Sequence, residues 1–157
     1  MEFKMTEELK KEYTRKITHA NRSQITVLTF EMALDYIADA ENAANIEEFD
    51  IAVKRSKKCV EQLLLSLDYK YGLSFTLMRI YNYVLQLYMK ALSKRDSSIL
   101  AEVNKILKGL HDSFEEVSKS DTSAPLMSNA EDVYTGLTYG KSGVNTSVSD
   151  YNRGFRV

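Results

Sequence analysis

The 157 residues suffice for one domain with a sizeable core, and 44% hydrophobic with 27% charged residues argues against disorder throughout the chain. The 21 Lys and Arg nearly balance the 22 Asp and Glu, and the formal charge of -1 excludes a global basic field that would attract nucleic acid. The single cysteine, Cys59, excludes an intramolecular disulfide, and no apolar run approaches the roughly 18 residues of a membrane span, so we expect a cytoplasmic protein without membrane insertion.

The first third of the chain predicts two helices. Thr6, followed by two glutamates, is typical of a helix start, and the segment to about Ala20 is weakly amphipathic. Asn21 and Gln24 form a capping-box variant, which predicts a second helix that runs to about Ala44. An ordinary surface helix needs only one apolar stripe. This helix has two, formed by Ile25, Leu28, Met32 and Tyr36, and by Val27, Phe30, Leu34 and Ile37.

The middle of the chain predicts two helices joined by a tight corner. Asn45 and Glu48 repeat the capping signal, so we expect a helix from Ile46 to Leu67. The corner spans Asp68 to Gly72, where glycine would supply the backbone freedom for the chain to reverse. A helix from Leu73 to Ser93 follows, also with two apolar stripes, which indicates either a central helix or one that offers its second face to a partner. The stripes comprise Leu73, Leu77, Ile80, Val84, Leu87 and Ala91, and Phe75, Met78, Leu85, Met89 and Leu92, with Tyr81, Tyr83 and Tyr88 between them.

Asp96 is predicted to cap a last helix from Ser97 to about Ser118, which has one clean apolar stripe. Four long amphipathic helices joined by short loops predict an all-α protein, namely an antiparallel up-and-down four-helix bundle with an extra N-terminal helical segment. At Lys119 the composition changes, because the remaining chain holds four of the six glycines and the one proline. We therefore expect a helical domain over residues 1–118 and a Gly/Ser/Asn-rich tail over 119–157, extended or docked on the bundle.

The sequence contains no pattern that indicates catalysis. His19 and His111 are far apart, and neither forms a metal-ligand pattern with Cys59, whose place inside a helix favours a buried, inert thiol. The tail glycines follow no phosphate-binding motif. We interpret the basic run from Lys54 to Lys58 as a solvated helix face rather than a nucleic-acid patch. The expectation is a protein that is not an enzyme and has no cofactor, metal or nucleic-acid partner.

Several motifs around the corner are similar to those of the FliS family of flagellar secretion chaperones. They are Leu64-Leu65-Ser66-Leu67-Asp68 at the end of one helix, Leu77 to Val84 in the next, and Lys94-Arg95-Asp96 before the last. Leu28 to Leu34 resembles the early helix of the family, and the similarity covers about Asn21 to Ser118. The chain departs from the family in having Asn21-Arg22-Ser23-Gln24 where Ser or Thr and then Pro-Glu-Glu are common. Its charged N-terminal segment also replaces one that bears a tyrosine.

The resemblance implies a cytoplasmic export chaperone that binds the C-terminal segment of flagellin, prevents its premature polymerisation and delivers it to the flagellar export apparatus. Flagellin is then the expected partner, the export gate is a second candidate partner, and the protein is a monomer or weak dimer. The surplus apolar stripes agree with this, since grooves between bundle helices suit an amphipathic client. The alternative is a non-enzymatic helical adaptor or homo-oligomerisation module, in which those stripes pair with another copy.

Two sets of candidate contact residues follow. The client-binding candidates lie on the doubly striped helices, where core packing is the competing interpretation for each: Phe30, Leu34, Phe75, Met78, Tyr81 and Tyr88. In the tail, apolar residues recur from Val133 to Val157. Tyr134, Leu137 and Tyr139 are candidates to dock on the groove of the bundle itself when no client is present. Alternatively, the tail is free and serves a separate partner.

Overall fold

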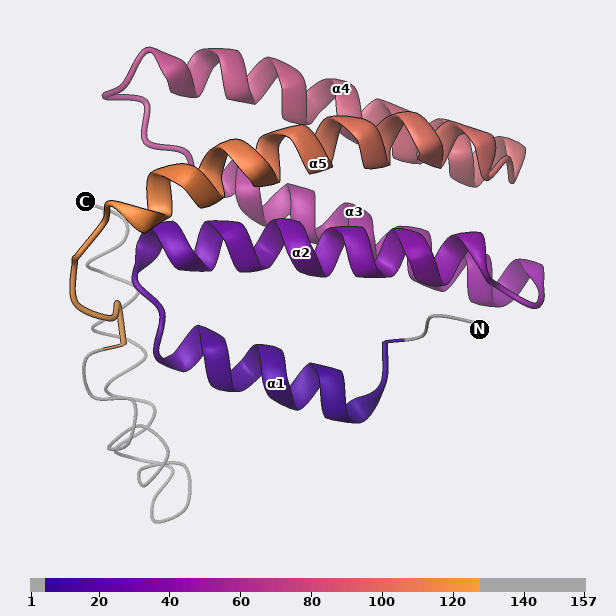
Figure 1. Cartoon of the computed structure of the whole chain (residues 1–157). Helices are drawn as coiled ribbons and strands as arrows, with labels where there is room; N and C mark the ends of the chain where they lie inside the picture. Colours follow the sequence, from indigo (N-terminus) through magenta and orange to yellow (C-terminus); the bar gives the residue numbers. More distant parts are fainter. Residues whose placement is uncertain (1–4, 128–157) are drawn as a thin grey trace, which may run out of the picture.

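The computed structural model describes residues 5–127, and within that range the chain forms helices and no strand. The helices are α1 (Glu7–Thr18), α2 (Arg22–Glu41), α3 (Ile46–Leu65), α4 (Leu73–Lys94) and α5 (Ser98–Lys119) (Figure 1). The predicted all-helical class is therefore confirmed. Within residues 5–127, none of the helices combines the length and the hydropathy that crossing a bilayer requires.

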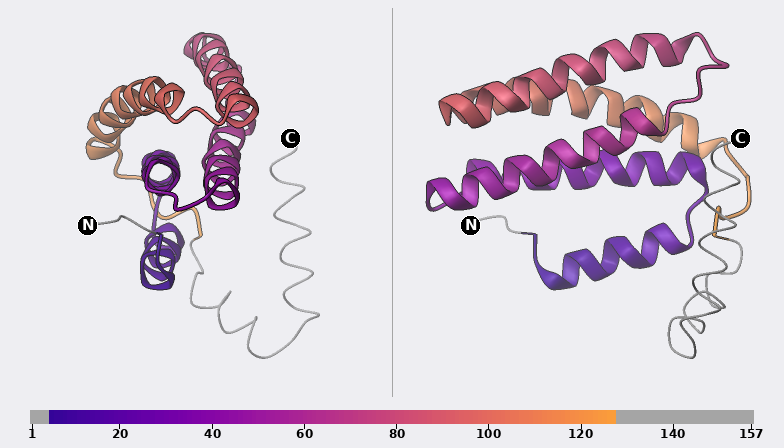
Figure 2. Two further views of the ribbon diagram at one scale, coloured as in Figure 1. Left: turned by 90° about the vertical axis from the view of Figure 1, so that its right-hand side faces the viewer. Right: turned by 180° about the vertical axis from the view of Figure 1, so that it is seen from behind.

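The four long helices form a closed ring of contacts. α2 packs against α3 and α5, and α4 packs against the same two helices. The left view of Figure 2 shows these four around a common centre, with α1 outside the ring and against α2. α2 thus has a neighbour on both its inner and its outer side, which is the physical reason for its two apolar stripes.

The starts of α2 and α3 confirm the predicted capping signals. The amide nitrogen of Gln24 donates to Asn21 Oδ1 at 2.9 Å, and the amide nitrogen of Asn21 donates to Gln24 Oε1 at 2.9 Å, which completes the capping box. Asn45 Oδ1 accepts from the Glu48 amide at 2.9 Å, but the Glu48 side chain accepts from the Ala44 amide at 3.1 Å. The bonds from the Gln24 and Glu48 amides satisfy N–H groups that the first helical turn leaves without a partner, and the other two bonds hold the amides of Asn21 and Ala44 just before each helix.

The α3–α4 corner corrects one expectation. Gly72 has ordinary right-handed helical angles, φ -59° and ψ -32°, and a Cβ atom added to it would meet nothing within 4 Å. The chain therefore reverses without using the conformational freedom of glycine. A left-handed residue occurs instead at Arg95, with φ 49°, directly after α4.

The remaining helix ends differ from the predicted ones by a few residues. α2 ends at Glu41 rather than Ala44, and α3 ends at Leu65 rather than Leu67. The N-cap residue of α5 is Ser97 rather than Asp96, although the Asp96 carboxylate still accepts from the Ser98 amide at 2.9 Å.

The core inside the ring contains large aromatic and aliphatic side chains from all four helices. The largest fully buried ones are Tyr81, Tyr88, Phe30, Ile37, Leu100 and Leu107. One polar pair lies among them. Ser56 Oγ donates to the Ala33 carbonyl at 2.7 Å and lies 2.6 Å from the Tyr88 hydroxyl, so both buried hydroxyl groups have partners.

A smaller core and two carboxylates hold α1 on α2. Met5, Tyr13, Ala20 and Leu28 form the apolar cluster between the two helices. The Tyr13 hydroxyl donates to the carboxylate of Asp35, and the Met5 amide donates to the Asp39 carboxylate at 2.9 Å. Burial raises the pKa of Asp35, against the opposing effect of the Tyr13 hydrogen bond.

Candidate functional site

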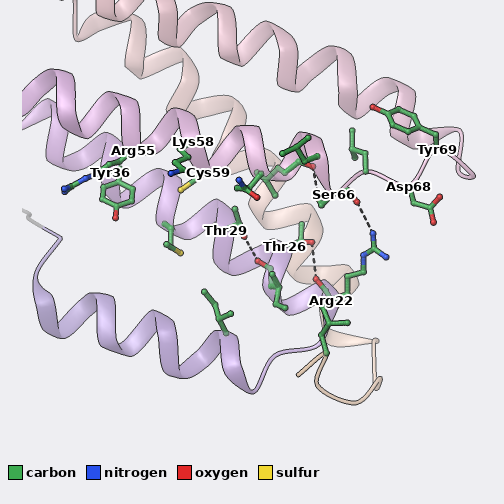
Figure 3. A pocket seen from close by; sticks show the side chains of 18 of the residues that line it. Arg22, Thr26, Thr29, Tyr36, Arg55, Lys58, Cys59, Ser66, Asp68 and Tyr69 are labelled. Carbon is green, nitrogen blue, oxygen red and sulfur yellow. Dashed lines mark hydrogen bonds between the residues drawn. The ribbon is translucent and has the colours of Figure 1, made fainter. Parts of the chain in front are cut away.

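A surface groove of about 1140 Å³ lies along α2 and α3, flanked by α1 and by the α3–α4 corner. Figure 3 shows it from close by, with Thr26 and Tyr36 from α2 and Arg55, Lys58 and Cys59 from α3. Its volume exceeds the roughly 300–1,000 Å³ that is usual for small-molecule pockets. A groove of this size suits a segment of polypeptide better than a small ligand.

Apolar side chains from three helices line the groove. Ile25, Met32 and Tyr36 come from the first apolar stripe of α2, and Cys59 and Leu63 lie one turn apart on α3. Ile17 of α1, Leu65, Leu67, Tyr69 and Leu126 add to this lining. The second α2 stripe contributes Phe30 and Ile37 to the core. The two stripes of α2 therefore differ in their main surroundings, because the second lies in the ring core whereas the first packs against α1 and lines the groove. Met32 and Tyr36 of the first stripe also pack against the edge of the ring core.

The charged residues that line the groove are mostly cations. Lys10, Arg22, Arg55, Lys58 and Lys70 line it, against the single carboxylate of Asp68. Arg22 Nη2 donates to the Ser66 carbonyl at 3.0 Å, and the Arg55 guanidinium lies 6.0 Å from the centre of the Tyr36 ring. Lys58 is exposed and makes no ion pair with any residue in the range 5–127. Part of the basic run on α3 thus borders a groove, where it would favour an acidic ligand.

Exposed apolar residues continue from the groove over the α3–α4 corner. We call Leu65, Tyr69, Tyr71, Leu73 and Phe75 the corner patch; all five are exposed, Leu65 at 78% and Phe75 at 50%. The Tyr69 and Phe75 rings lie 5.2 Å apart. Leu65 and Tyr69 also line the groove, so the two surfaces are continuous. Contiguous apolar surface of this kind marks a binding region more often than isolated exposed side chains do.

The chain after α5 reaches the end of this groove. We call residues 121–127 the strap. Asn21 Nδ2 donates to the Asp121 and Ser123 carbonyls, each at 3.3 Å, and the Ser23 hydroxyl donates to the Asp121 carboxylate at 2.5 Å. The Leu126 amide donates to the Ala20 carbonyl at 3.0 Å, and its side chain lines the groove. The residue that caps α2 therefore also anchors the strap.

The six client-binding candidates have different environments. Phe30, Tyr81 and Tyr88 are almost completely buried in the ring core, so the expectation that all six face outward is wrong for these three. Leu34 and Met78 are partly buried, and Phe75 belongs to the corner patch. The periodicity did not distinguish these cases, because it gives the angle of a side chain around its helix but not the neighbouring element that covers it. Whether any of the six touches a client stays a prediction.

The groove residues Arg55, Lys58 and Cys59 were missed as candidates. A signal for them existed, because Cys59 and Leu63 share a helical face and Arg55 lies one turn before Cys59. The candidates Tyr134, Leu137 and Tyr139 lie outside the described residues.

The described part of the molecule offers neither an accessible reactive thiol nor a group of side chains placed to bind a metal ion. Burial raises the pKa of the Cys59 thiol to about 11, so the thiol is protonated and weakly nucleophilic at neutral pH. His19 is the C-cap of α1, whereas His111 lies in α5 beside Asp112, Glu115 and Glu31. No group of three or more His, Cys, Asp or Glu residues within 5–127 is placed to hold a metal ion.

The described chain combines a ring of four helices, an outer helix, an open apolar groove and an exposed apolar corner. This is the architecture of helical proteins that bind other chains. The family model described as "Flagellar protein FliS" matches residues 5–121, and the chain belongs to this family. The match confirms the resemblance and extends it to α1. Membership implies a role as a flagellar export chaperone, in a family that is not known for enzymes. A comparison with curated proteins found no match.

Proposed function

We propose that this protein binds the C-terminal segment of flagellin in the cytoplasm, prevents its premature polymerisation and delivers it to the flagellar export apparatus. The family match over all five helices is the observation that carries this proposal. In this proposal α2 to α5 act as an antiparallel up-and-down four-helix bundle, which is compatible with their closed ring of contacts. The export gate is a further candidate partner in the delivery step.

The proposed contact surface includes the three candidates that keep some exposed area, Phe75, Leu34 and Met78. Phe75 supplies the best-supported position, because it is half exposed and its ring contacts Tyr69 in the corner patch. An amphipathic client would bury its apolar face against such a surface. Phe30, Tyr81 and Tyr88 would support the shape of the bundle from the core rather than touch the client.

Titration calorimetry tests the client. We expect one flagellin to bind per chaperone, and we expect the affinity to disappear when the C-terminal segment of flagellin is removed. Equal affinity for full-length and truncated flagellin would overturn the proposal.

A matched pair of variants tests the surface. Phe75→Ala should weaken flagellin binding by about 1 to 4 kcal/mol if the residue is a hot spot, with little change in melting temperature. Tyr83→Ala is the control, since Tyr83 is also exposed on α4 but its hydroxyl bonds to Glu102 of α5. Equal effects of the two substitutions on affinity would remove Phe75 from the contact surface.

The alternative function, a helical adaptor or homo-oligomerisation module, is favoured by the exposed apolar residues of α4, which include Met89 at 55% exposure. The solution mass distinguishes the two functions. A monomer or weak dimer that takes up one flagellin agrees with the chaperone, whereas a tight homodimer that ignores flagellin agrees with the adaptor.

A further inference from the structure

The strap brings the end of the described chain to the groove. Leu126 lines the groove, and its backbone is bonded to Ala20 in the connection between α1 and α2. The hydrogen bonds from Asn21 and Ser23 hold Asp121 and Ser123 against the same connection. The chain that follows Met127 therefore starts next to the groove, one residue after the groove-lining Leu126.

The segment that follows has a suitable length. Residues 131–139 read Glu-Asp-Val-Tyr-Thr-Gly-Leu-Thr-Tyr. In an extended form they span about 30 Å, at about 3.3 Å per residue. The part of α2 that lines the groove runs from Arg22 to Tyr36 and rises about 21 Å, at 1.5 Å per residue. The segment is thus long enough to follow the groove to its far end.

The chemistry of the segment also complements the groove. It begins with two acids, Glu131 and Asp132, and has no cation. The groove has five cationic residues and one carboxylate, and Lys58 has no ion-pair partner within residues 5–127. The segment then continues with two tyrosines and a leucine, which suit an apolar lining that includes Ile25, Met32 and Leu63.

We propose that residues 131–139 of this chain dock in the groove along α2 and α3. Glu131 and Asp132 pair with the cations of the groove, and Tyr134, Leu137 and Tyr139 cover its apolar lining. The same chain is the preferred occupant, because the anchored strap gives the segment an effective concentration in the millimolar range. This inference does not depend on the identity of the client.

Methionine methyl NMR on the full-length protein tests the contact. Met32 lines the groove, whereas Met89 is exposed on α4 and serves as an internal reference. The variant Tyr134→Ser/Leu137→Ser/Tyr139→Ser should shift the Met32 methyl resonance and leave Met89 unchanged. The matched control Val148→Ser/Tyr151→Ser/Phe155→Ser removes equally apolar residues further along the chain and should shift neither. An unchanged Met32 resonance in the first variant would overturn the proposal.

The alkylation rate of Cys59 gives a second readout. It is the one thiol in the sequence, and it lines the groove. With an effective concentration of about 1 mM and a segment affinity of about 0.1 mM, the groove is about 90% occupied, so loss of docking should speed alkylation about tenfold. The rate should not change on dilution. A protection that disappears on dilution would assign the groove to the tail of a second copy and would overturn docking within one chain.

A charge exchange tests the proposed ion pairs. Arg22→Glu/Lys70→Glu should accelerate alkylation of Cys59 in the same way as the serine variant, because these two cations line the groove near the end at which the strap arrives. Adding Glu131→Lys/Asp132→Lys to this protein should restore slow alkylation, because each side then carries the opposite charge. Failure of the second exchange to restore protection would remove the acids from the docking contact.

Discussion

The buried pair of Ser56 and Tyr88 offers a sharp test of the core, because Tyr88 was also a candidate for client contact. Both side chains are fully buried. Since Ser56 Oγ donates to the Ala33 carbonyl, the Tyr88 hydroxyl must donate to Ser56 Oγ across their 2.6 Å separation. Burial raises the pKa of Tyr88, so the hydroxyl keeps its proton at neutral pH.

The geometry predicts unequal effects of the two single substitutions. Tyr88→Phe removes one hydrogen bond but leaves Ser56 bonded to Ala33, so we expect a loss of about 1 kcal/mol in the free energy of unfolding. Ser56→Ala leaves the buried Tyr88 hydroxyl without its partner, which should cost about 2 to 3 kcal/mol. The double variant removes both hydroxyl groups. It should be more stable than the sum of the single losses predicts, by about 1 kcal/mol or more.

Chemical denaturation of the wild type, the two single variants and the double variant measures this coupling. Flagellin affinity is measured on the same proteins under conditions in which they are folded. Additive losses would refute the pairing, and equal losses in the two single variants would refute the proposed hydrogen-bond direction. Tyr88→Phe should also leave flagellin affinity unchanged, because the side chain lies in the core. A variant with wild-type stability and weakened flagellin binding would return Tyr88 to the contact surface.

Three further predictions concern the outer helix and the strap. Asn21→Ser keeps a capping oxygen for α2 but removes the side-chain amide that holds the strap, so the free energy of unfolding measured by denaturation should fall by about 1 to 2 kcal/mol. Asn21→Ala also removes the capping oxygen and should lose about 1 kcal/mol more. Equal losses in the two variants would contradict the role of Asn21 as both helix cap and strap anchor. Hydrogen bonds from Ser123 and Ser23 lower the pKa of Asp121 from 3.8, so the stability that its carboxylate contributes is present above that value and is lost as pH falls through the folded-state pKa. Asp121→Asn should therefore reduce the fall in melting temperature at acidic pH. A fall of wild-type size in this variant would show that Asp121 does not contribute to it. Burial raises the pKa of Asp35, so the stability due to this group decreases as pH rises through its folded-state pKa. Asp35→Asn keeps an acceptor for Tyr13 and should remove this part of the decrease in melting temperature between pH 4 and 8. A decrease of wild-type size in the variant would show that Asp35 is not its source.

The family and most helix boundaries could be predicted from the sequence because their signals are local. The Asn21–Gln24 pair specifies the start of α2 through bonds within one helical turn, and the observed capping box reproduces them. Apolar spacing likewise predicted α4 to within one residue at its end. The corner motifs carried the family resemblance, which the family match confirms.

The tertiary structure alone decided which apolar face meets which neighbour. Periodicity gives the angle of a side chain around its helix but not the element that covers it, so Phe30 and Met32 looked alike although one lies in the ring core and the other lines the groove. The groove itself requires α1, α2, α3 and the strap together. Asn21 bonds to Asp121 and Ser123, about one hundred positions away in the chain, and no local rule could have paired them.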